Sequence, residues 1–131
     1  MTVARVLVVD DDKTFIRRVT VSLGSMADVE TLSSGDDLLG FVQIWRPDVI
    51  VLNLLLDDRD GFQLLEELLD LKLLPAPYVL CSTSGPAAKT RVCPCAKWPV
   101  GTISRGTQLQ QIRETVQAVL ESRSELLAAV S

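Results

Sequence analysis

The sequence contains no histidine, and this absence excludes several kinds of enzyme at once. Without an imidazole there is no Ser-His-Asp or Cys-His nucleophile, no histidine-ligated zinc, and no histidine that shuttles protons near neutral pH. Any chemistry of this chain must therefore rest on carboxylates, hydroxyls, amides and cations.

Cysteines are few, and a long apolar run is missing. Cys81, Cys93 and Cys95 form an odd set in a chain that shows no secretory signal, so a disulfide framework is not expected. For Cys93 and Cys95, reduced thiols in an irregular loop are favoured over a redox switch or a metal site. The apolar stretch near the N-terminus meets an acid at Asp10, too early for a signal peptide or a membrane span. We expect a cytoplasmic protein that does not contact the membrane.

Concentrated positive charge is also missing. Thirteen Lys and Arg residues against seventeen Asp and Glu residues give a net charge of -4, and no basic tract is present that would neutralise the phosphates of a duplex. We therefore expect no nucleic-acid partner. The chain has 131 residues, of which 47% are hydrophobic, and this is enough for one ordinary domain that folds unaided.

Apolar runs of strand length alternate with helical patterns along the chain. This rhythm predicts βαβ units and a single doubly wound parallel sheet, an α/β fold of five strands and five helices. The expected strands cover residues 6–9, 28–32, 49–52, 78–81 and 100–104. The expected helices cover residues 13–25, 38–45, 62–69 and 107–129, with a short or irregular fourth helix within 84–99.

Polar residues follow the predicted strands, at the edge where such sheets bind ligands. Asp10 and Asp11 follow the first strand, and two adjacent carboxylates repel each other unless a cation lies between them. They are candidate Mg²⁺ ligands. A role as a helix cap is the alternative, although Asp12 can fill that role alone.

Asn53, Ser82 and Arg105 follow three other strands. An oxygen, a hydroxyl and a cation at these places would complete a phosphoryl-transfer site beside the acid pair. Lys97 is a second candidate for the cation, but it lies only fifteen residues after Ser82, and it would require a strand through Pro94.

These residues and their spacing resemble the receiver domain of two-component response regulators. The likeness covers residues 5–120 and includes Gly61, eight residues after Asn53. It implies a flavodoxin-like sheet with strand order 2-1-3-4-5 and a role in phosphorelay signal transduction. It also implies switch and phosphate-contact positions at Ser82, Thr83, Thr102 and Arg105.

The chain departs from the family at the residue that accepts the phosphoryl group, because the resemblance places Asn53 where the family has aspartate. A neutral amide oxygen is a poor nucleophile and forms no stable acyl phosphate. Losing one carboxylate also weakens Mg²⁺ binding at Asp10 and Asp11, and no cofactor is required.

The departure predicts a pseudo-receiver that is not an enzyme. It would act through contacts with protein partners of a signalling pathway, independently of phosphorylation, and a homodimer is one form that such contact can take. One alternative is a working phosphorelay receiver that uses Asp57 or Asp58 as a substitute acceptor. Another is an α/β domain that binds a small anion or a nucleotide.

Leucines mark two further segments. Residues 64–74 carry more of them than one core-facing stripe needs, which indicates either a wide buried face or an exposed patch for a partner that includes Leu65, Leu69 and Leu73. The last helix would be ~34 Å long. We therefore divide the chain into a domain of residues 1–122 and an extension of residues 123–131, where Leu126 and Leu127 form a docking tail or a frayed end.

Overall fold

The computed structural model describes residues 3–73, 75–83 and 100–130, and its centre is one five-stranded sheet. The strands lie in the order β2-β1-β3-β4-β5, and every neighbouring pair is parallel. The predicted fold class and strand order are confirmed. The strands are β1 (Ala4–Val9), β2 (Ala27–Leu32), β3 (Val49–Asn53), β4 (Tyr78–Thr83) and β5 (Val100–Ser104).

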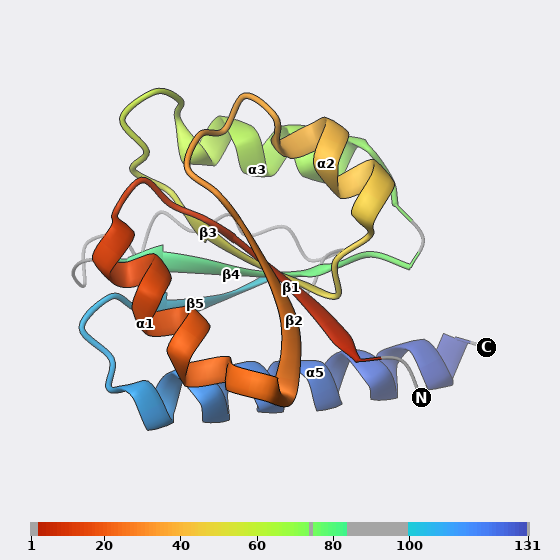
Figure 1. Ribbon diagram of the computed structural model, residues 1–131. Helices are drawn as coiled ribbons and strands as arrows, with labels where there is room; N and C mark the ends of the chain where they lie inside the picture. Colours follow the sequence, from red (N-terminus) through yellow and green to blue (C-terminus); the bar gives the residue numbers. More distant parts are fainter. Residues whose placement is uncertain (1–2, 74, 84–99, 131) are drawn as a thin grey trace.

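Helices cover both faces of this sheet. Figure 1 shows α2 and α3 on one face and α1 and α5 on the other. Their bounds are α1 (Lys13–Leu23), followed by a short 3₁₀ turn (Gly24–Met26), then α2 (Leu38–Trp45), α3 (Gly61–Asp70) and α5 (Leu109–Val130). The expected fourth helix, with Cys93, Cys95 and Lys97, falls within residues 84–99, outside the described residues.

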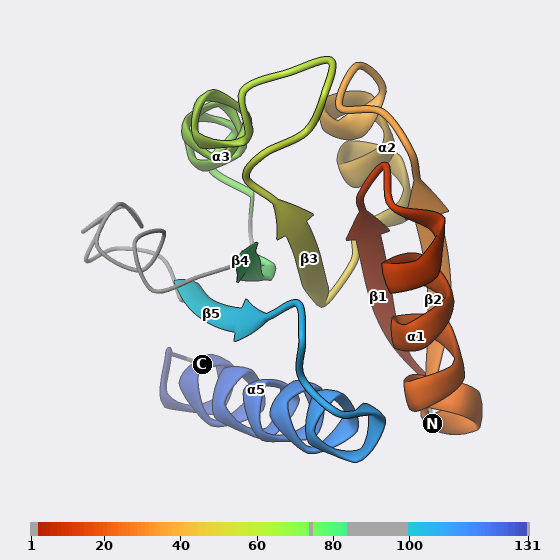
Figure 2. The same cartoon turned by 90° about the vertical axis from the view of Figure 1, so that its left-hand side faces the viewer.

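The two layers explain why the central strands are apolar throughout. Successive side chains of a strand point to opposite faces. Val6 and Val8 of β1 pack in the layer of α1 and α5, whereas Leu7 and Val9 pack in the layer of α2 and α3. All five residues of β3 are buried. Figure 2 shows the same layers after a turn of 90° about the vertical axis.

The helix ends follow from a few local residues. The Asp12 and Asp60 side chains accept N–H bonds at the starts of α1 and α3. Gly24 ends α1 with a φ of 52°, which glycine adopts without strain. Arg46 ends α2 with a φ of 55°, directly before Pro47.

The leucines of α3 and of the following loop belong to the core. Leu65 is 0% and Leu73 8% exposed, and the partly buried Leu69 packs against the same cluster. The expectation of an exposed patch at these residues is therefore corrected in favour of a wide buried face. The reason is that the loop after α3 folds back onto the layer that α2 and α3 already form.

Helix α5 runs on without a break past residue 122, the expected end of the domain. Arg123, just beyond it, is 8% exposed and bonds Asp48 and Ala76, so it packs as part of the domain. The Leu126 and Leu127 side chains lie outside the described part of the structure. Among the described residues, no helix combines the length and the apolar character that a membrane crossing needs.

Candidate functional site

Four strand ends bring the predicted site residues to one edge of the sheet. Asp10 directly follows β1, and Asn53 is the last residue of β3. The register pairs Asn53 with Ser82 of β4, and Arg105 directly follows β5. Their side chains are joined by hydrogen bonds into one cluster. We call Asp10, Asn53, Ser82 and Arg105 the crevice cluster.

Asn53 is 6% exposed, and both ends of its amide are bonded. Its Nδ2 donates to Asp10 Oδ1 at 3.2 Å, and its Oδ1 accepts the N–H of Leu55 at 2.8 Å. Chemistry fixes this orientation, because a carboxylate only accepts and a peptide N–H only donates. The amide oxygen therefore closes the turn after β3.

Arg105 places its guanidinium in the middle of the cluster. Nη1 donates to Asp10 Oδ2 at 2.5 Å and to Ser82 Oγ at 3.2 Å. Nη2 donates to Asp12 Oδ2 at 3.0 Å and to Asp10 Oδ1 at 3.3 Å. The guanidinium carbon also lies 4.5 Å from the centroid of the Phe15 ring. Burial alone lowers the pKa of Arg105, but the bonds and charges of Asp10 and Asp12 outweigh it and raise that pKa.

Asp12 both caps α1 and binds the cluster. Its Oδ1 accepts the N–H of Thr14 at 2.9 Å and of Phe15 at 3.4 Å, while Oδ2 contacts Arg105. The bond from Phe15 is the largest cause that lowers the pKa of Asp12 below its ordinary 3.8, and Arg105 lowers it further. The sequence identifies Asp12 only as a cap. Its contact with Arg105, ninety-three residues away, carries no local signal.

The loop between β3 and α3 closes onto Asn53 through Gly61. The N–H of Gly61 bonds the carbonyl of Leu54 at 3.1 Å. A Cβ on Gly61 would lie 2.3 Å from Leu54 Cα and 2.6 Å from the Asn53 carbonyl oxygen. Only glycine permits so close an approach of two backbones. This contact is the physical reason why position 61 requires glycine.

Asp57 and Asp58 are the two acids considered as substitute acceptors. Their contacts are with residues outside the crevice cluster. Asp57 has an exposed side chain, and it is its backbone N–H that bonds Asp11 Oδ2, at 2.8 Å. The Asp58 carboxylate accepts the Ser34 hydroxyl at 2.5 Å and the N–H of Gly35 at 3.3 Å. The Ser34 bond is the main cause that lowers the pKa of Asp58. Asp58 thus ties this loop to the turn before α2.

Thr102 and Thr83 are the two remaining predicted switch and phosphate-contact positions. Thr102 of β5 is half-buried and lines a surface hollow between β5 and α5. Thr83 ends β4, and its side chain is outside the described part of the structure. The switch and phosphate-contact roles of both residues stay predictions.

Comparison with known proteins agrees with this fold. Residues 6–117 match the family described as the response regulator receiver domain. The chain belongs to this family. Receiver domains are modules of two-component signalling. The predicted family, the response regulator receiver domain, is confirmed.

Solved receiver domains share the fold at low sequence identity. The signal receiver domain of a putative Luxo repressor protein from Vibrio parahaemolyticus superposes with a TM-score of 0.83 at 18% identity, covering 99% of this chain and 98% of that one. A CheY-like receiver domain protein from Methanospirillum hungatei gives 0.80 at 20% identity, covering 95% and 98%.

A curated relative is similar over part of the chain. It is a protein-glutamate methylesterase/protein-glutamine glutaminase of Caulobacter vibrioides, 32% identical over 82 residues. The match covers 60% of this receiver and 23% of the relative. The matched segment is therefore about a quarter of that protein's length.

The family resemblance implies Mg²⁺ at Asp10 and Asp11, but several of the oxygens that would bind it already accept bonds from the protein, among them Asp11 Oδ2 from the N–H of Asp57. Mg²⁺ requires near-octahedral oxygen ligands at short distances. Both oxygens of Asp10 are held by Arg105, and the single oxygen of the Asn53 amide is held by Leu55. Within the described ranges, no group of three or more acidic or cysteine side chains is arranged to hold a metal ion.

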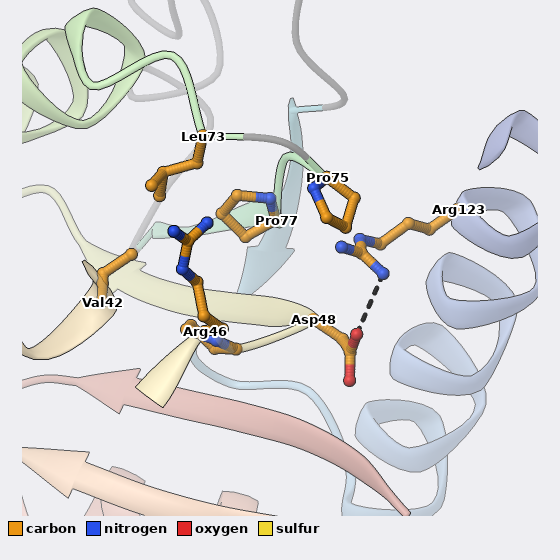
Figure 3. Close-up of a pocket in the computed structure, with 8 residues that line it drawn as sticks. Val42, Arg46, Asp48, Leu73, Pro75, Pro77 and Arg123 are labelled. Carbon is orange, nitrogen blue, oxygen red and sulfur yellow. Dashed lines mark hydrogen bonds and ion pairs between the residues drawn. The ribbon is translucent and has the colours of Figure 1, made fainter. Parts of the chain in front are cut away.

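The opposite edge of the sheet carries a second arginine–aspartate cluster. Arg123 donates from Nη1 to Asp48 Oδ1 at 2.9 Å and from Nε to the carbonyl of Ala76 at 2.9 Å. Asp48 Oδ2 accepts the N–H of Arg5 at 2.8 Å. No motif in the sequence pointed to this pair. Figure 3 shows it beside a cavity of about 300 Å³ that is lined by Val42, Arg46, Pro47, Asp48, Leu73, Pro75, Pro77 and Arg123.

Proposed function

We propose that this receiver is a pseudo-receiver, which takes part in signalling through protein contacts that do not depend on phosphorylation. The observation that carries the proposal is the neutral Asn53 amide at the end of β3, bonded on one side to Asp10 and on the other to Leu55. Phosphoryl transfer needs a charged oxygen that is free to attack phosphorus in line. The Asn53 oxygen has neither property.

The surroundings of Asn53 support the same function. The Asp10 carboxylate is 1% exposed and is neutralised by Arg105. The Arg105 fork also holds Ser82, the hydroxyl that the resemblance assigns to phosphate contact. A phosphoryl group would therefore have to displace bonds that already satisfy these side chains, which adds a cost to its binding.

The test is incubation with acetyl phosphate and MgCl₂, followed by intact-mass measurement. We expect no added phosphoryl group on the wild-type chain. Asn53→Asp is the matched variant, because it restores a carboxylate of nearly the same size at the same place. A hydroxylamine-labile phosphoryl group on the wild-type protein would overturn the proposal.

If labelling does occur, Asp57→Asn and Asp58→Asn identify its site. Loss of the label in either variant would establish the alternative of a substitute acceptor. The contacts of Asp58 argue against this acid as the acceptor, because its carboxylate is bonded to Ser34 and Gly35. Asp57 in turn contributes its backbone, rather than its carboxylate, to the bond with Asp11.

The partners are then proteins of a signalling pathway, among them a second copy of this chain. Light scattering across a range of protein concentrations tests the homodimer. A pathway partner is tested by comparing its binding before and after acetyl phosphate treatment. Equal affinity in both states is expected, and a phosphate-dependent affinity would contradict the proposed independence.

A further inference from the structure

Asp10 has its acceptor sites filled by the protein itself. Oδ1 receives the N–H of Asp12 at 2.9 Å, Nδ2 of Asn53 at 3.2 Å and Nη2 of Arg105 at 3.3 Å. Oδ2 receives Nη1 of Arg105 at 2.5 Å. A carboxylate with about four lone-pair sites has little capacity left for another ligand. A divalent cation at Asp10 would first have to expel the guanidinium.

Arg105 is suited to this place by its shape as well as its charge. Its planar fork bonds side chains from the end of β1, the start of α1 and the end of β4, namely Asp10, Asp12 and Ser82. One face of the fork lies over the Phe15 ring. A lysine ammonium is a compact point charge without a flat fork, so it would not bond these three side chains in the same way.

The loop that carries Arg105 is also fixed at its far end. The Arg18 guanidinium of α1 donates to the carbonyl of Thr107, and the Ser22 hydroxyl donates to the carbonyl of Leu109 at 2.5 Å. The loop between β5 and α5 is therefore held by α1 on one side and by the crevice cluster on the other. The bonds of Arg105 form the part of this attachment that belongs to the crevice cluster.

We propose that Arg105 is the resident cation of the crevice: it replaces a divalent metal at Asp10 and latches the β5–α5 loop to β1 and β4. This proposal rests on the proposed function and states how the pseudo-receiver is held in one state. A bound Mg²⁺ can dissociate, so the state of such a site would depend on the Mg²⁺ concentration. A covalently attached guanidinium keeps the Asp10 carboxylate paired whether or not Mg²⁺ is present.

The experiment compares Mg²⁺ binding by the wild type and by Arg105→Gln, using calorimetry together with the amide NMR shifts of Asp11, Asn53 and Leu55. We expect these amides of the wild type to stay unshifted in millimolar MgCl₂ and its Tm to be the same with Mg²⁺ or with EDTA. Arg105→Gln should melt lower, and its affinity for Mg²⁺ should rise on the order of tenfold, which corresponds to about 1.4 kcal/mol of binding free energy.

Arg59→Gln is the matched control, because it removes an arginine that pairs with Asp36 and Glu67 outside the crevice. It should bind Mg²⁺ no better than the wild type. If Arg105→Gln does not fold, Arg105→Lys takes its place, since it keeps the charge and loses the fork. It too should bind Mg²⁺ more tightly than the wild type. Equal Mg²⁺ affinity in the wild type and the Arg105 variant would overturn the latch.

The latch and the proposed function fail in different ways. A wild-type protein that binds Mg²⁺ at the crevice and takes up no phosphoryl group contradicts the latch and leaves the pseudo-receiver in place. Labelling of the wild type by acetyl phosphate contradicts the pseudo-receiver, whatever its Mg²⁺ affinity.

Discussion

The two edges of the sheet carry similar ion pairs in different surroundings. At the carboxyl edge Arg105 pairs with Asp10, whose side chain is 1% exposed, and at the amino edge Arg123 pairs with Asp48, whose side chain is 32% exposed. Asp10 follows β1 and its partner Arg105 precedes α5, whereas Asp48 precedes β3 and its partner Arg123 belongs to α5. At both edges of the sheet, an arginine side chain forms an ion pair with an aspartate and so connects the sheet to the segment around α5.

The strongest test of this comparison removes each arginine in turn. Arg105→Gln leaves a buried carboxylate without its cation, which costs about 3 kcal/mol of unfolding free energy. Arg123→Gln leaves a carboxylate that water reaches, and we expect about 1 to 2 kcal/mol. Urea unfolding measures both. Equal losses would show that burial does not distinguish the two edges.

Gly61→Ala tests whether the loop after Asn53 fixes the carboxyl edge. The added methyl group would meet the backbone of Leu54 and Asn53, and backbone cannot move aside as a flexible side chain does. We expect a loss of about 2 kcal/mol, typical of overpacking. Gly40→Ala on α2 is the control, because nothing lies within 4 Å of a Cβ there. A neutral Gly61→Ala would contradict the close approach.

Two substitutions at Asp12 separate its cap from its contact with Arg105. Asp12→Ala removes both and should cost about 1 kcal/mol, the usual value of an N-cap. Asp12→Ser keeps a capping oxygen and removes the charge that faces Arg105. The difference in unfolding free energy between the variants measures the cap. If Asp12→Ser is as unstable as Asp12→Ala, the charge contact dominates.

The smallest effect concerns pH and the loop acid Asp58. Its pKa is lowered from 3.8 in the folded protein, mainly by the Ser34 hydroxyl, so its contribution to stability is present above pH 3.8. That contribution is lost as the pH falls through the lowered pKa. Ser34→Ala should therefore flatten the fall of stability with acid below this pH. An unchanged slope would contradict the Ser34 bond.

The parts of the site that the sequence predicted are those with a local signal. Asp10, Asn53 and Ser82 were predictable because each directly follows or ends an apolar run of strand length, and parallel strands bring such ends to one edge. The role of Asp12 as a cap was predictable from its place before a helix. The α3 leucines were ambiguous, because periodicity does not reveal whether a second layer covers them.

The sequence by itself determined the order of strands and helices along the chain, the strand-end positions of the site residues and the presence of an asparagine at the end of the third strand. These follow from residue type and spacing along the chain. Only the tertiary structure decided that Arg105 neutralises Asp10, that Phe15 lies beneath the guanidinium and that Arg123 reaches Asp48. The physical reason is that each contact joins residues far apart in the chain, and the packing of the two helical layers against the sheet sets the direction in which a long side chain extends.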